Sequence, residues 1–146
     1  MDWWEVQMAY NVLIVDDSAT MRTLIRKVLA ISGFKLGECF EGANGKEALS
    51  VLERHWVDLI LSDLHMPEMD GGDLLKALRG HHLWCTIPVV FITTEGRREV
   101  LQPLMDLGCQ GYIQKPFRPE AIRQQLASIL GETEAPDVRQ LEGCDF

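Results

Sequence analysis

The sequence predicts an α/β protein built on a doubly wound, five-stranded parallel sheet with helices on both faces. Short, continuously apolar, β-branched runs recur along the chain, and segments with apolar residues at helical spacing separate them. Runs of this kind are typical of strands that are buried on both faces of a parallel sheet. Four of the runs also end on residues that can take part in phosphate chemistry, namely Asp16 with Asp17, Asp63, Thr93 and Lys115.

The first three strand–helix units occupy roughly the first half of the chain. A strand at 11–15 is followed by a helix that Ser18 can cap and that Gly33 ends. A weaker strand at 36–40 precedes a helix at 44–54, and a strand at 57–62 precedes a helix at 70–79. The crossover helices lie between strands that run in the same direction, as a parallel sheet requires.

Two further units complete the sheet. A strand from 88 to 92 precedes a helix at 95–107, and a strand at 111–114 precedes a helix at 119–130. Pro103 lies inside the fourth helix, which we therefore expect to be short, bent or mobile. The carboxyl ends of the strands share one edge, where the reversal of strand order opens a crevice for a ligand.

The length of 146 residues predicts one folded domain, which we place at residues 10–130. Residues 1–9, with Trp3 and Trp4, form an aromatic arm that either covers an edge of the core or makes a self-association or partner contact. Residues 131–146 form an acidic tail with no helical stripe, and we expect this tail to be flexible.

Charge and composition exclude several classes of protein. The net charge of −8 and the lack of a Lys/Arg cluster argue against nucleic-acid binding. No apolar run approaches the roughly 20 residues of a membrane span, so we expect no membrane insertion. The widely spaced cysteines and the acidic, aromatic start predict reduced thiols in a cytoplasmic protein, with Cys39, Cys85 and Cys109 as small buried residues.

The acidic edge predicts an aspartyl-phosphate site with a divalent cation. Two carboxylates about 4 Å apart repel by about 4 kcal/mol at an effective dielectric near 20, and Mg²⁺ is the hard cation that such oxygens favour. Asp63 is the candidate nucleophile, because it is single, central and followed by a loop at 64–71. Asp16 and Asp17 would hold the metal, Lys115 would pair with phosphoryl oxygens, and Thr93 would donate a hydrogen bond to them.

These motifs closely resemble the receiver domain of two-component response regulators, particularly the stand-alone chemotaxis (CheY-like) type. The matching segments are 16–17, 62–71, 93–95 and 111–117, in order and with suitable gaps, and the resemblance covers residues from about 10 to 130. It implies a flavodoxin-like strand order of 2-1-3-4-5.

The resemblance also implies residue roles in phosphorelay signal transduction. Asp63 would accept a phosphoryl group from a histidine kinase or phosphotransfer protein. Mg²⁺, for which Mn²⁺ can substitute, would be bound by Asp17, Asp63 and the backbone carbonyl of His65, with Asp16 one shell further out. His65 and Glu95 occupy the positions that tune the lifetime of the phosphoryl group.

Switching is implied in the same way. Thr93 would move toward the phosphoryl group and Tyr112 would rotate inward, which changes the surface made by the fourth helix, fifth strand and fifth helix. The bond between Lys115 and Pro116 is expected to be cis. The protein would act as a monomer or weak dimer on a downstream protein target, with only weak autophosphorylation and autodephosphorylation as enzymatic activities.

Four other functions are alternatives to this one. An aspartyl-phosphate hydrolase of the haloacid dehalogenase type needs a second Asp two residues after the nucleophile, where this chain has His65. A phosphate sink or relay without its own target, or a pseudo-receiver scaffold that is not phosphorylated, would keep the same fold. Nucleotide binding is disfavoured, because neither a P-loop nor G-x-G-x-x-G follows the first strand.

Overall fold

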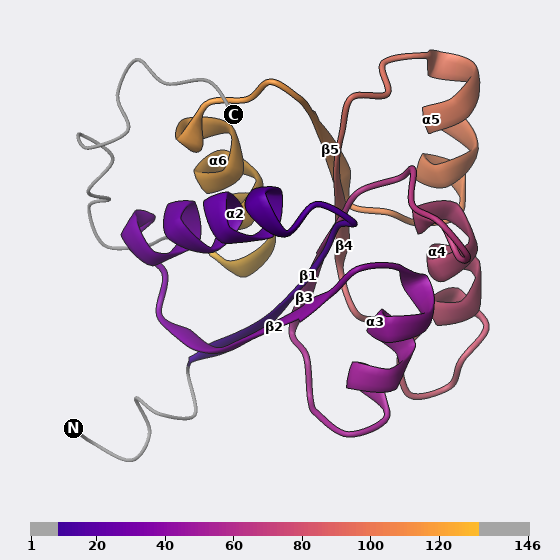
Figure 1. Cartoon of the computed structure of the whole chain (residues 1–146), viewed down its shortest axis with the longest axis horizontal. Helices are drawn as coiled ribbons and strands as arrows, with labels where there is room; N and C mark the ends of the chain where they lie inside the picture. The colour runs from indigo at the N-terminus through magenta and orange to yellow at the C-terminus, as the bar shows by residue number, and fades with distance from the viewer. Residues whose placement is uncertain (1–8, 132–146) are drawn as a thin grey trace.

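A computed structural model describes residues 9–131 and shows the predicted five-stranded parallel sheet, in the order β2-β1-β3-β4-β5 (Figure 1). This confirms both the fold class and the strand order that the resemblance implied. The interpretations of residues 1–8 and of the tail from residue 132 onward lie outside the described residues.

The elements alternate along the chain as expected for a doubly wound sheet. In chain order they are β1 (Tyr10–Val15), α2 (Ala19–Ile31), β2 (Leu36–Gly42), α3 (Gly45–Leu52), β3 (Leu59–Ser62), α4 (Gly71–Arg79), β4 (Val89–Thr93), α5 (Arg98–Asp106), β5 (Gly111–Gln114) and α6 (Pro119–Leu130).

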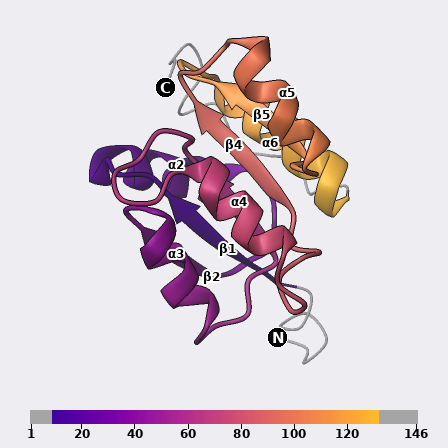
Figure 2. The same ribbon diagram turned by 90° about the vertical axis from the view of Figure 1, so that its right-hand side faces the viewer.

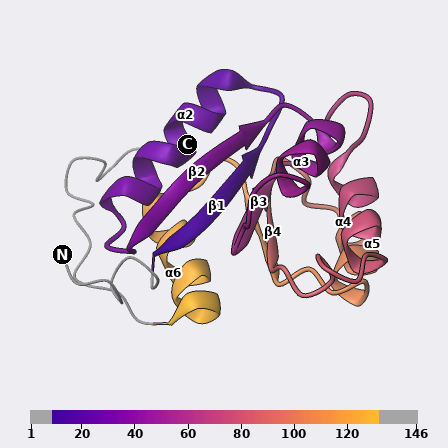
Figure 3. The same cartoon turned by 90° about the horizontal axis from the view of Figure 1, so that it is seen from below.

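The helices form a layer on each face of the sheet. Helices α2 and α6 cover one face, and α3, α4 and α5 cover the other (Figures 1 and 3). Successive residues of a strand point to opposite faces, so Val12 and Ile14 pack under α2 and α6, whereas Leu13 and Val15 pack under α3 and α4. All four side chains are completely buried, which explains why the strand reads as an uninterrupted apolar run.

Side-chain caps decide where three of the helices begin. Ser18 accepts a hydrogen bond from the backbone N–H of Met21, and Asn44 accepts one from that of Glu47. Asp70 does the same for Asp73 at the start of α4. Each of these helices therefore begins one residue after its cap, as capping chemistry requires.

Helix α5 departs from the sequence prediction, which began it at residue 95. It starts at Arg98, and its N-cap Arg97 makes no side-chain capping bond. Glu95, buried beside the strand ends, is tied instead to Arg97, and this ion pair keeps residues 95–97 in a loop. The helix is short, as expected, and runs past Pro103 to Asp106.

The cysteines also differ in part from expectation. Cys109 is buried, but Cys39 is only partly buried and Cys85 is exposed in the segment between α4 and β4. Local apolarity cannot distinguish a loop thiol from a core thiol, so the prediction for Cys85 was wrong. Within residues 9–131 no helix is long and apolar enough to cross a membrane.

Candidate functional site

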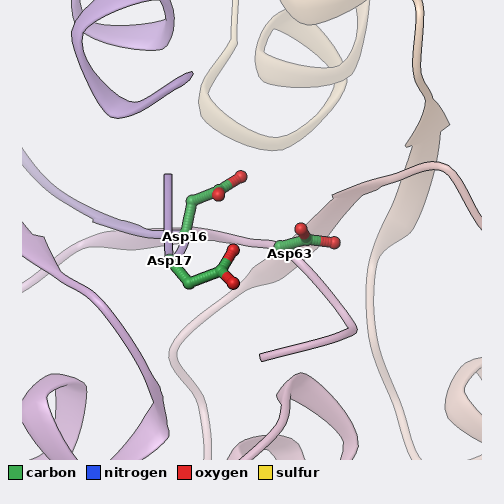
Figure 4. A group of neighbouring side chains, drawn as sticks. All are labelled: Asp16, Asp17 and Asp63. Atoms are coloured by element: carbon green, nitrogen blue, oxygen red, sulfur yellow. The ribbon is translucent and has the colours of Figure 1, made fainter. Parts of the chain in front are cut away.

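Three carboxylates meet where β1 and β3 end. Val15 and Ser62, the last residues of these two neighbouring parallel strands, lie opposite each other in the sheet. Asp16, Asp17 and Asp63 therefore emerge side by side, with one oxygen from each within 4.8 Å of the others (Figure 4). The sequence predicted this convergence from the shared edge of a parallel sheet.

The backbone orients two of these carboxylates. Oδ1 of the buried Asp16 accepts a hydrogen bond of 2.8 Å from the N–H of Ser18. Oδ1 of Asp63 accepts one of 2.7 Å from the N–H of Leu64. The second oxygen of each carboxylate faces the ammonium group of Lys115, whereas Asp17 is exposed.

Lys115 reaches these carboxylates from the end of a more distant strand. It follows β5, which is separated from β3 by β4. Its Nζ lies 2.9 Å from Oδ2 of Asp16 and 3.3 Å from Oδ2 of Asp63, so one ammonium group offsets part of the charge of two carboxylates. The peptide bond to Pro116 is cis, as the resemblance implied.

Thr93 ends β4, the strand between Asp63 and Lys115, and its side chain is completely buried. Its Oγ1 accepts a hydrogen bond of 3.2 Å from the N–H of Glu95, which leaves the hydroxyl hydrogen free to be donated. Tyr112 lies on the adjacent β5 and is 43% exposed. The residues assigned to switching therefore occupy neighbouring strands, one inside the protein and one at its surface.

A second polar cluster joins the loops after β3 and β4. Oε1 of Glu95 lies 3.2 Å from Nε2 of His65, and both oxygens of Glu95 accept hydrogen bonds from the guanidinium of Arg97. The bonds from Arg97 lower the pKa of Glu95 to about 2, so this buried carboxyl is ionised at neutral pH. The sequence analysis identified His65 and Glu95 but missed Arg97. An acidic and a basic residue two positions apart are common in loops, so this spacing does not by itself indicate an ion pair.

The donor set fits a divalent cation. Carboxylate oxygens are hard ligands that suit Mg²⁺, and the convergence of three of them creates the negative charge that such an ion neutralises. Asp16, Asp17 and Asp63 are the one group of at least three potential metal ligands found in the described part of the chain. The side chain of His65 is engaged with Glu95 rather than with these carboxylates.

The fold and the site define a class of protein, an α/β domain with an acidic cluster at the carboxyl edge of its parallel sheet. The family model for the response regulator receiver domain matches residues 12–127, and the chain belongs to this family. Receiver domains of this CheY-like kind are signalling proteins rather than classical enzymes.

Characterised relatives are chemotaxis proteins of similar length. The chain is 35% identical over 122 residues to chemotaxis protein CheY1 of Helicobacter pylori strain J99, covering 83% of this chain and 97% of that protein. It is 34% identical to the CheY homolog of Campylobacter jejuni serotype O:23/36, over 83% of this chain and 92% of that protein.

Solved structures show the same fold. CheY4 of Vibrio cholerae superimposes with a TM-score of 0.74 at 33% identity, over 83% of this chain and 98% of that one. The Borrelia burgdorferi structure of a CheX-CheY-BeF3-Mg²⁺ complex matches with a TM-score of 0.74 at 26% identity, covering 84% of this chain and 90% of that one.

Proposed function

We propose that this protein is a single-domain response regulator that accepts a phosphoryl group on Asp63 from a histidine kinase or phosphotransfer protein. The observation that carries the proposal is the position of Lys115, whose ammonium group contacts both Asp16 and Asp63. An ammonium beside a candidate nucleophile can bind the oxygens of an incoming phosphoryl group, which would otherwise be repelled by the carboxylates.

The reaction is a direct transfer between two groups. An oxygen of the Asp63 carboxylate forms a bond to phosphorus, while the bond from phosphorus to the donor imidazole nitrogen breaks and its electron pair stays with that nitrogen. Asp17, Asp63 and the backbone carbonyl of His65 would hold Mg²⁺, with Asp16 one shell further out. The ion would supply positive charge for the phosphoryl oxygens. Lys115 and the hydroxyl of Thr93 bind those same oxygens.

Transfer then changes the surface of α5, β5 and α6. The Thr93 hydroxyl moves to the phosphoryl group, and the half-exposed Tyr112 rotates into the space that this movement opens. A partner protein that prefers the new surface shifts the population toward it. The phosphoryl donor and the downstream target are both proteins, and we expect both in the cytoplasm. Mn²⁺ can replace Mg²⁺ as the bound cation.

Phosphorylation by acetyl phosphate tests this function. We expect about one phosphoryl group per protein in Mg²⁺, almost none in EDTA, and none in Asp63→Asn under either condition, because the substitution removes the nucleophile. Asp73→Asn, an exposed change on α4, is the matched control and should label like the wild type. Labelling of Asp63→Asn at the wild-type rate would show that another residue is the acceptor.

A further inference from the structure

We propose that Arg97 is a positioning residue that controls the lifetime of the phosphoryl group through Glu95 and His65. The proposal rests on the function proposed for Asp63 above and extends it to a residue outside the cluster of three aspartates. Arg97 contacts none of the three aspartates, and its side chain is 65% exposed. Its influence must therefore pass through the residues that it binds.

Glu95 is the centre of the arrangement. Its side chain is 6% exposed, and its two oxygens accept hydrogen bonds of 2.9 Å from Nε and 2.8 Å from Nη2 of Arg97, with a third from the Arg97 backbone. A bidentate guanidinium–carboxylate pair fixes both distance and orientation. Arg97 thus decides where a largely buried carboxylate points.

The same carboxylate holds His65. Nε2 of His65 lies 3.2 Å from Oε1 of Glu95, and the His65 side chain is otherwise 58% exposed. His65 follows Asp63 by two residues in one loop, and Glu95 follows Thr93 by two residues in the next. Because β3 and β4 are neighbours, the contact joins the two loops just beyond the candidate acceptor and its hydroxyl partner.

This geometry predicts that the His65 ring slows the attack of water on the phosphoryl group. A His65 ring held by Glu95 restricts the ways in which water can line up for attack on phosphorus beside Asp63. Removal of the Arg97 side chain deprives Glu95 of both guanidinium donors and leaves only the backbone N–H of residue 97, so the carboxylate turns toward solvent and releases the ring. The phosphoryl group should then be lost faster.

Decay of the phosphorylated full-length protein tests the inference. After labelling with acetyl phosphate and removal of the donor, Arg97→Ala should lose its phosphoryl group at least about threefold faster than the wild type. Arg98→Ala is the matched control: Arg98 is the next residue, exposed, with no ion pair among residues 9–131. Arg97→Lys should lie between the two, because lysine keeps the charge but loses the bidentate geometry.

A double-mutant cycle separates positioning from a general structural effect. In a His65→Ala background, Arg97→Ala should leave the decay rate unchanged within about 1.5-fold, because its route of action is gone. The same acceleration in both backgrounds, or no acceleration in either, would overturn the inference while leaving Asp63 as the acceptor. Failure of the wild type to become labelled would instead overturn the proposed function itself, and the inference with it.

Discussion

The ammonium nitrogen of Lys115 lies 2.9 Å from a carboxylate oxygen of Asp16, although 99 residues separate the two in the chain. Asp16 is almost completely buried, and burial of a charge is costly without a partner. The pair therefore stabilises the fold as well as preparing the site, and a divalent cation would take over part of its role when bound.

Lys115→Ala should lower the free energy of unfolding in EDTA by about 3 kcal/mol, because it leaves a buried carboxylate unpaired. Mg²⁺ should restore more stability to this variant than to the wild type, since the variant has more uncompensated negative charge. Urea unfolding with and without Mg²⁺ measures both effects. Lys76→Ala, an exposed change on α4, is the control, and equal Mg²⁺ responses in all three proteins would contradict the prediction.

Thr93→Ala should bind Mg²⁺ with wild-type affinity but should not transmit the phosphorylated state to Tyr112. The hydroxyl is not a metal ligand in our proposal, yet it is the group that moves to the phosphoryl oxygens. Addition of beryllofluoride with Mg²⁺, followed by NMR of the Tyr112 ring, reports the change. The exposed Thr94→Ala is the matched control, and a full Tyr112 response in Thr93→Ala would remove Thr93 from the switch.

Gly71→Ala should destabilise the protein by about 2 kcal/mol or more through overpacking. A Cβ there would clash with the backbone oxygen of Asp63 and lie 2.7 Å from the ring of Phe91, so the loop that carries the acceptor must shift. Phosphorylation should slow as well. Gly80→Ala, whose nearest contact would be 3.5 Å, is the control for thermal unfolding, and equal melting temperatures for the two variants would refute the packing argument.

Glu41 should make a small, pH-dependent contribution to stability. Partial burial would raise its pKa, but hydrogen bonds from Arg22 and Arg26 outweigh this and lower the pKa below its usual 4.5. A lowered folded-state pKa means that the stabilisation is present above pH 4.5 and is lost as the pH falls through the folded value. Glu41→Gln should therefore cost about 0.5–1 kcal/mol at pH 7 and progressively less below pH 4.5.

Chemical denaturation at a series of pH values measures this difference. Glu38→Gln, a change at an exposed neighbour on the same strand, is the matched control. A constant cost of Glu41→Gln between pH 7 and pH 3 would mean that the two ion pairs do not stabilise the fold.

Local sequence determined the strands, the helix caps and the chemistry of the strand ends. Apolar runs such as 59–61 are buried on both sides and therefore carry no polar interruption, which makes them recognisable without a structure. Ser18, Asn44 and Asp70 act within three residues of themselves, so their capping role is also readable from the chain.

Tertiary structure alone decided the features that depend on distant neighbours. The helical pattern predicted a start for α5 at residue 95, but burial of Glu95 beside His65, 30 residues earlier, and its pairing with Arg97 moved the start to Arg98. Cys85 is exposed because it falls in a surface segment between α4 and β4. The spacing of apolar residues along the chain predicts helices and strands. Ion pairs between loops, and the burial of loop residues, arise only when the sheet brings separate loops together.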